Sequence, residues 1–189
     1  MQTLKFVSIA VALEFTLGFI LALILNQDIR GGRIYRFICI LPMMLMPTII
    51  GFIWKFLYHG DIGLINYVLS FLGIQRRPWL GNADTAMYAI ILTDVWQWTP
   101  FCFLVLLAGL QSLPIEPFEA AKIDGASRWL IFKNITIPLL KPSIIVALLF
   151  RTIDSFKIFD LIYVMTHGGP GNATMVMSLY IYRWAFIFQ

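Results

Sequence analysis

Charged residues are scarce in this sequence, and cysteine and histidine are nearly absent. Aspartate, glutamate, lysine and arginine make up 13% of the 189 residues, about half the share that soluble globular domains carry. The composition therefore excludes an ordinary soluble domain. The two cysteines, Cys39 and Cys102, lie in apolar runs without the spacing of a metal knuckle or a redox pair, and we interpret both as packing residues.

Catalytic and nucleotide-binding motifs are also missing. There is no G-x-x-x-x-G-K-[ST] segment to bind ATP, and His59 and His167 have no cysteine or carboxylate cluster nearby at ligand spacing. An intramembrane hydrolase would need paired aspartates or a serine and histidine motif, and neither is present. We therefore predict that the chain is not an enzyme, holds no metal or cofactor, and does not bind nucleic acid.

Long apolar runs are what the sequence has instead. Hydrophobic residues make up 60% of the chain and the mean hydropathy is +0.83. Four runs, at about 6–25, 37–57, 86–110 and 138–165, reach the roughly 20 residues that a membrane-spanning helix needs. Because lipid cannot satisfy backbone polar groups, the spans must be helical. We predict an all-α, multi-pass membrane protein with one transmembrane domain over residues 1–189.

The distribution of lysine and arginine predicts the orientation of the spans. Two loops are basic and should be cytoplasmic; they carry Arg30, Arg33 and Arg36, and Lys122, Arg128 and Lys133. The loop at 58–85 balances its arginines with aspartates, and the loop at 167–174 has no lysine or arginine, so both should face outside. Residues 175–189 are too few to span and rich in aromatics, which favours an interfacial helix.

The cytoplasmic loop at 114–137 is longer than a simple connection requires. Pro117 suits the first turn of a helix and Gly125 suits its end. Ser127 can cap a second short helix that runs to Asn134. We predict a helix, a glycine turn and a second helix on the cytoplasmic face.

The same loop carries a recognisable spacing of residues. Its members are Glu119, Ala120, Ala121, Asp124, Gly125 and Pro138. They resemble the E-A-A-x3-G-x9-I-x-L-P loop of ABC importer permeases, with Ile137 in place of the usual leucine. The segments "LAGLQSLP", "FDLIYVMTHGGPGNAT" and "WLGN" resemble the maltose and glycerol-phosphate permease-like branch, which imports sugars and polyols. The family's first and last spans have no counterpart, so we expect a fragment at both ends.

This resemblance implies a type I importer permease fold and a defined set of partners. The hairpin would be a coupling helix that docks on a separate ATPase subunit, which binds the ATP and magnesium. A second permease subunit, an extracytoplasmic solute-binding protein and the lipid bilayer would complete the assembly, in a prokaryotic cytoplasmic (inner) membrane. The alternative is that the hairpin is an amphipathic element resting on lipid headgroups.

Polar side chains inside the first and third spans are candidates for a substrate path. Glu14 lies midway along the first span, and Asp94 and Gln97 lie in the third beside two tryptophans. Carbohydrate sites join polar groups to aromatic faces, and transporters bind substrate near mid-membrane. Alternatively, these polar groups hold neighbouring helices together.

The fourth span carries a stripe of alternating charge. Arg151, Asp154, Lys157 and Asp160 recur every three residues. As one continuous helix, residues 138–166 would extend about 42 Å, beyond the roughly 30 Å hydrocarbon core. Asp154 and Asp160 are therefore candidates for the outer mouth of the path, or members of a self-neutralising structural set.

Two further predictions remain open. Pro42 and Pro47 should bend or loosen the second span, as a source of flexibility or as a purely structural feature. The rival function is a secondary transporter driven by an ion gradient, with Glu14, Asp94 and Asp154 as coupling sites. That rival predicts no ATPase partner and leaves the loop at 114–137 unexplained.

The predicted orientation can be tested with single cysteines at Gly32 and Asn172, on a background lacking Cys39 and Cys102. An impermeant thiol reagent applied to intact cells should label the cysteine at Asn172 and spare the one at Gly32, because only the loop at 167–174 is predicted to face outside. Labelling at Gly32 alone would invert the topology and remove the basis for a cytoplasmic hairpin.

Overall fold

The computed structural model describes residues 1–27 and 30–187, and it contains helices and no strand within those ranges. Three long helices form the body of the molecule: α1 (Gln2–Leu25), α5 (Ala83–Gln111) and α8 (Ile137–Phe156). The other helical elements are α2 (Gly32–Ile40), η1 (Leu41–Met44), α3 (Pro47–Leu57), α4 (Leu64–Phe71), α6 (Glu116–Ile123), α7 (Arg128–Ile131), η2 (Phe132–Thr136), α9 (Asp160–Thr166) and α10 (Met177–Phe186).

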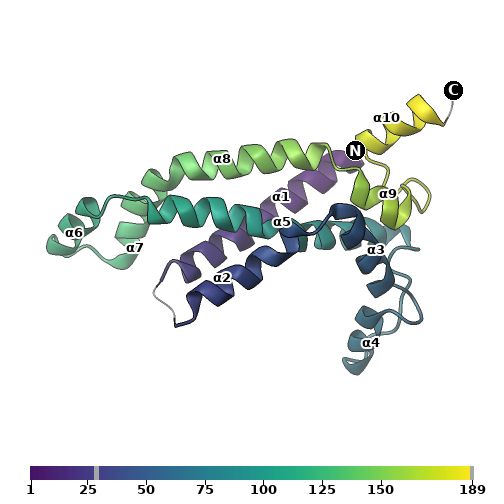
Figure 1. The fold of residues 1–189 in the computed structure, drawn as a ribbon, viewed down its shortest axis with the longest axis horizontal. Helices are drawn as coiled ribbons and strands as arrows, with labels where there is room; N and C mark the ends of the chain where they lie inside the picture. Colours follow the sequence, from purple (N-terminus) through teal and green to yellow (C-terminus); the bar gives the residue numbers. More distant parts are fainter. Residues whose placement is uncertain (28–29, 188–189) are drawn as a thin grey trace.

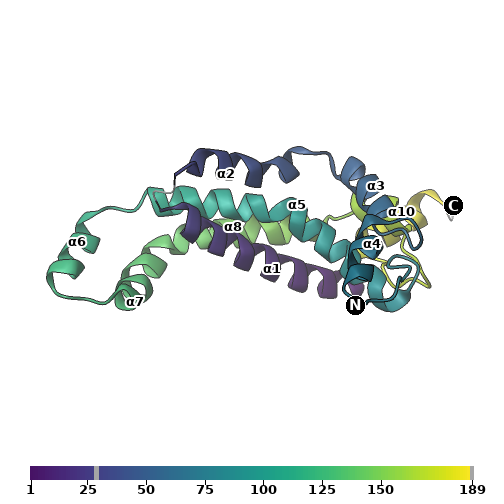
Figure 2. The same ribbon diagram turned by 90° about the horizontal axis from the view of Figure 1, so that it is seen from below.

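The three long helices lie side by side with α2 running alongside α5, and most of the shorter elements gather at the two ends of the bundle (Figures 1 and 2). The α6–α7 hairpin extends beyond one end. The N-terminus lies at the opposite end, together with α3, α4, α9 and α10 (Figure 2). The two ends of the bundle therefore carry different structures.

Among residues 1–27 and 30–187, three helical runs are long and apolar enough to cross a membrane. They are Gln2–Leu25, Ala83–Gln111 and Arg128–Phe156. A fourth crossing results if the bent pair Gly32–Met44 and Pro47–Leu57 counts as one span. The prediction of an all-α membrane bundle is confirmed.

The second predicted span is broken at its prolines. Pro42 lies in the 3₁₀ turn η1, and Pro47 is the first residue of α3. Leu45 and Met46 between them are extended, with ψ of 145° and 135°. For Met46 this is expected, because it directly precedes Pro47. The two halves meet at 95°, so the predicted bend is present and is a sharp break.

The fourth predicted span is not one continuous helix, and this part of the sequence prediction is wrong. Helix α8 ends at Phe156, and α9 begins at Asp160. After the break Leu161 and Ile162 are almost completely buried, and α9 packs against α3 and α5. Burial of these apolar side chains redirects the chain without a proline or a glycine at the break. The predicted charged stripe is therefore divided between two helices.

The α6–α7 hairpin differs from its prediction in one respect. Helix α6 ends before Gly125, which has φ of +72°, and the Ser127 hydroxyl accepts the Leu130 N–H at 3.3 Å to cap α7. However, α7 does not stop at Asn134. It continues through the π turn η2 into α8, so Arg128–Phe156 is one helical run of 29 residues.

Apolar packing forms two clusters along the bundle. One joins buried residues near the α3–α9 end, including Phe6 and Ile90, and the other joins residues nearer the hairpin, including Phe103 and Leu106. Gly18 permits the close approach of α1 and α5, because a Cβ atom there would lie 2.6 Å from the Cys102 Cβ. On α1, Glu14 lies between the residues that belong to the first cluster (Phe6–Val11) and those that belong to the second (Ala22 and Leu25).

Candidate functional site

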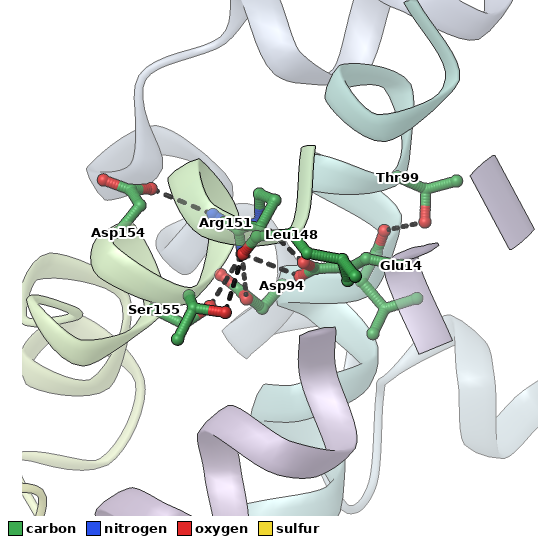
Figure 3. A network of polar contacts seen from close by, with 9 residues as sticks. Glu14, Asp94, Thr99, Leu148, Arg151, Asp154 and Ser155 are labelled. Carbon is green, nitrogen blue, oxygen red and sulfur yellow. Dashed lines mark hydrogen bonds and ion pairs between the residues drawn. The ribbon is translucent and has the colours of Figure 1, made fainter. Parts of the chain in front are cut away.

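The centre of the charged cluster is Arg151 of α8. Its Nε donates to Glu14 Oε2 at 2.6 Å and its Nη2 donates to Glu14 Oε1 at 2.8 Å, a bidentate pair between α8 and α1. Nη2 also donates to Asp94 Oδ2 of α5 at 3.1 Å, and Nη1 donates to Asp154 Oδ2 at 2.9 Å. Figure 3 shows Arg151 with Asp154 on one side and Glu14 on the other. One guanidinium thus joins all three long helices.

Two further contacts complete the environment of this guanidinium. Arg151 Nη2 lies 3.1 Å from the Ser155 hydroxyl oxygen, one helical turn further along α8. The Trp98 ring lies over the guanidinium, with 5.0 Å between its centroid and Arg151 Cζ, within the range of a cation–π interaction. The arginine is therefore held by an aromatic face as well as by carboxylates.

The cluster has more acidic than basic groups. Arg151, Glu14 and Asp94 are almost completely buried, whereas the Asp154 side chain is 46% exposed and also lies 3.6 Å from Lys157. Buried charges are tolerated inside a membrane only when they are paired. Arg151 pairs with both buried carboxylates, so the cluster stabilises the helix arrangement and presents one carboxylate, Asp154, toward open space.

That open space is a hollow of about 150 Å³ beside the cluster. The residues that line it are Pro47, Asp94, Gln97, Trp98, Arg151, Asp154, Ser155, Lys157, Ile158, Phe159, Asp160 and Leu161. The hollow lies where both broken segments meet the bundle, at the start of α3 and between α8 and α9. A more apolar hollow of about 330 Å³ shares Trp98, Arg151, Asp154 and Lys157 and extends to Phe101 and Phe150.

Gln97, one of the residues that line the first hollow, has an unused hydrogen-bond acceptor. Its Nε2 donates to the Leu45 carbonyl at 3.3 Å, across the break between η1 and α3. Its Oε1 is buried without a hydrogen-bond partner. Buried polar groups are nearly always bonded, so this oxygen is an exception among the buried groups of the described residues.

The predicted path residues thus fall into two groups. Asp94, Gln97, Asp154 and Asp160 line the hollow, although Asp160 belongs to α9. Glu14 is completely buried and is not among the lining residues, and its contacts are with Arg151.

The predicted coupling residues lie far from the hollow, on the α6–α7 hairpin. Glu119, Ala120, Asp124 and Gly125 are exposed there, Ala121 is half-buried, and Pro138 is exposed near the start of α8. Three large apolar side chains beside them, Ile115, Ile123 and Trp129, are 68%, 87% and 69% exposed. Exposed apolar side chains grouped with charges are typical of a protein-binding surface.

Sequence reasoning missed several structural residues. It placed Arg151 in the charged stripe of the fourth span but did not identify it as the residue that bonds to Glu14, Asp94 and Asp154. It did not consider Ser155. It also missed Asn66 of α4, which is buried and bonded to the following loop. The only available signal for Asn66 is a single amide within the apolar segment "LINYVLSF".

Residues 14–188 match the family described as binding-protein-dependent transport system inner membrane component. The chain is 48% identical over 183 residues to the trehalose/maltose transport system permease protein MalF of Thermococcus litoralis, covering 96% of this chain and 62% of that protein. It is 40% identical over 167 residues to the sulfoquinovosyl glycerol transport system permease protein SmoG of Agrobacterium fabrum, covering 88% and 54%. It is 36% identical over 177 residues to the trehalose transport system permease protein SugA of Mycobacterium tuberculosis, covering 94% and 56%.

Solved structures share the fold. One is a bacterial ABC transporter involved in the import of the acidic polysaccharide alginate, with a TM-score of 0.86 and 26% identity over 98% of this chain and 66% of that chain. Another is a bacterial alginate ABC transporter in complex with an alginate pentasaccharide-bound periplasmic protein, with a TM-score of 0.85 and 26% identity over 97% and 65%. The chain spans between 54% and 62% of the length of the three relatives named above.

The Arg151 cluster generates a stability prediction. Arg151→Met leaves Glu14 and Asp94 buried without a cation, which should destabilise the protein by about 3–5 kcal/mol. Adding Glu14→Gln and Asp94→Asn should restore most of the loss, because the remaining amides carry no charge. Thermal unfolding of the purified transporter measures both effects.

Lys157→Met is the matched control for this series. Lys157 is 69% exposed, and its pair with Asp154 should contribute no more than about 1 kcal/mol. Equal destabilisation by Arg151→Met and Lys157→Met would contradict a structural role for the buried cluster.

Proposed function

We propose, because the chain belongs to the family of binding-protein-dependent transport system inner membrane components, that it forms the permease part of an ATP-driven importer for a sugar, oligosaccharide or polyol. The relatives named for trehalose, maltose and sulfoquinovosyl glycerol transport support this substrate class. The structural observation that carries the proposal is the exposed hairpin, which places Glu119 and Gly125 at the far end of the bundle.

The hairpin has the mechanical properties that a coupling element needs. Helix α7 runs without a break through η2 into α8, so a force applied near Gly125 acts on the same helical run that carries Arg151. Glu119 and Asp124 offer negative charge to a cationic partner, and Ile123 offers an apolar anchor. We assign Ala120, Ala121 and Pro138 to the same interface, on an ATPase subunit that binds ATP and magnesium.

The hollow beside Arg151 is the proposed substrate path. Trp98 offers an aromatic face, Gln97 offers an unpaired acceptor, and Asp154 offers a half-exposed carboxylate. Sugars bind to such combinations, because ring faces stack on aromatics while hydroxyl groups bond to carboxylates and amides. We place Asp94 and Asp160 on the walls of the path, and we assign Glu14 the indirect role of positioning Arg151.

The remaining partners follow from the family description. A binding-protein-dependent system requires a solute-binding protein outside the membrane, and one solved neighbour is in complex with a periplasmic protein. We propose that α10 and the loop at 167–174 receive this protein, that a second permease subunit completes the path, and that the assembly lies in a prokaryotic inner membrane. An ion-coupled secondary transporter has less support, because Glu14 and Asp94 are already bonded to Arg151.

The coupling proposal predicts that Gly125→Val and Glu119→Lys lower both ATPase co-purification and substrate uptake. Valine at the φ of +72° that Gly125 adopts costs about 1–2 kcal/mol in backbone strain, and lysine at Glu119 repels a cationic partner. Uptake assays in vesicles and pull-down of the ATPase subunit measure the two effects.

Gly73→Val and Asp61→Lys are matched controls at the opposite end of the bundle. Gly73 has φ of +74° and open space around it, so valine causes similar strain there. These two variants should keep the ATPase bound. Normal coupling in Gly125→Val and Glu119→Lys would refute the hairpin assignment, and uptake by the permease alone in a proton or sodium gradient would favour the secondary transporter.

The path proposal predicts weaker substrate recognition in Gln97→Leu. Loss of one hydrogen bond to a substrate hydroxyl should raise the half-saturation concentration for uptake about two- to tenfold, with the subunits still assembled. Gln111→Leu, at the exposed C-terminal end of the same helix, should leave it unchanged. An unaltered half-saturation concentration in Gln97→Leu would exclude this residue from the path.

A further inference from the structure

An apolar groove lies at the end of the bundle opposite the hairpin, between α3, α4 and α5. It encloses about 580 Å³, within the range of about 300–1,000 Å³ that is typical of small-ligand sites. Its lining residues are Trp54, Tyr58, Ile65, Leu69, Trp79, Thr85, Tyr88, Ala89 and Leu92. Helix α4, which supplies one wall, projects sideways from the bundle (Figure 1).

Asn66 fixes the walls of this groove. The side chain is 1% exposed, and its Nδ2 lies 2.8 Å from the Arg77 carbonyl and 2.9 Å from the Gly60 carbonyl. Its Oδ1 accepts the Trp79 indole N–H at 2.8 Å and the Arg77 backbone N–H at 3.3 Å. The hydrogen bonds of this one buried amide therefore connect α4 to the loop that carries Trp79. They fix the relative positions of the groove walls.

Three of the five polar side-chain groups in these walls, those of Tyr58, Trp79 and Thr85, are already engaged within the protein. Trp79 donates its indole N–H to Asn66, and the Tyr58 hydroxyl donates to the Ala89 carbonyl at 3.1 Å. The Thr85 hydroxyl donates to the Trp79 carbonyl at 2.6 Å. A saccharide needs convergent polar partners, whereas a hydrocarbon chain needs none. The groove is therefore suited to a hydrocarbon chain.

With the middle of α5 placed at the midplane of the bilayer, the groove lies at the edge of the hydrocarbon layer. Gln97 is the middle residue of α5, and Tyr88 lies nine residues before it, which corresponds to about 14 Å along the helix. The hydrocarbon core extends about 15 Å from the midplane of a bilayer. Trp54, Trp79 and Tyr88 thus lie where interfacial aromatic residues are enriched, and an acyl chain of the adjacent leaflet can enter the groove.

The charges around the groove favour an anionic headgroup. Lys5 of α1 is exposed, and its Nζ lies 4.3 Å from the centroid of the Tyr88 ring. Lys55 of α3, next to the groove residue Trp54, adds a second positive charge, and the loop at 58–85 balances Arg76 and Arg77 with Asp61 and Asp84. The segments around the groove therefore carry an excess of two positive charges, and a phosphate beside Lys5 would balance part of it.

We propose that this groove binds an acyl chain of an anionic phospholipid, with the lipid phosphate held at Lys5. The site is separate from the hollow beside Arg151 and from the hairpin, and it does not depend on the transported substrate.

The test uses the assembled transporter in detergent and compares retained phosphatidylglycerol with retained phosphatidylcholine by native mass spectrometry. We expect phosphatidylglycerol to bind more tightly by about fivefold, the effect of one lysine near a lipid surface. Lys5→Glu should abolish that preference, and Leu69→Trp should reduce binding of both lipids by filling the groove. Two control variants, Lys133→Glu and Leu149→Trp, change exposed positions away from the groove. They should retain both lipids as the unaltered protein does.

Photocrosslinking identifies the occupant independently of these variants. A benzophenone amino acid at Leu92, which is 54% exposed on the groove wall, should crosslink to lipid in bilayers containing phosphatidylglycerol. Crosslinks to a protein chain instead would make the groove a protein interface and overturn the proposal. Equal retention of the two lipids by the unaltered protein, or unchanged retention in both Lys5→Glu and Leu69→Trp, would overturn it as well.

Discussion

The buried guanidinium of Arg151 needs anionic partners, and the arrangement of the three long helices supplies them. A charge in the interior of a membrane protein is costly unless a partner and hydrogen bonds compensate it. Glu14 comes from α1 and Asp94 from α5, so the cluster can form only when both helices face α8 at this depth. Apolar packing on either side of the cluster is less directional. The ion cluster therefore sets the register of the helices, and the apolar clusters add stability to that register.

This arrangement divides the molecule into a rigid part and two joints. The ion cluster joins α1, α5 and α8, and the absence of a side chain at Gly18 lets α1 pack closely against α5. By contrast, the chain is broken between η1 and α3, where it turns by 95°, and again between α8 and α9. Both breaks border the hollow beside Arg151. A displacement of the hairpin would therefore move the three-helix unit as one body, and the change of shape would occur at the two breaks.

Hydropathy and local motifs predicted the parts of the fold that depend on short-range information. The apolar runs, the turn at Gly125 and the break between Pro42 and Pro47 each follow from residues close together in sequence. The end of α8 at Phe156 does not, because it depends on burial of Leu161 and Ile162 against α3 and α5. The partnership of Glu14 and Arg151 spans 137 positions, and no local pattern encodes it. Their location inside apolar runs indicated only that each needed some partner.

The buried polar groups differ in how completely the fold satisfies their hydrogen bonds. Asn66 and Arg151 are held in dense networks, as expected for groups that stabilise a fold. Within the described ranges, only Arg36 Nε and Gln97 Oε1 are buried side-chain polar atoms without a hydrogen-bond partner. Arg36 still donates through Nη2 to the Leu25 carbonyl at 2.7 Å, so its guanidinium caps α1. Gln97 Oε1 has no such structural explanation, and the Gln97 side chain is among those that line the hollow bordered by the two helix breaks. An unpaired buried acceptor costs stability, which fits the proposed role of Gln97 in the path.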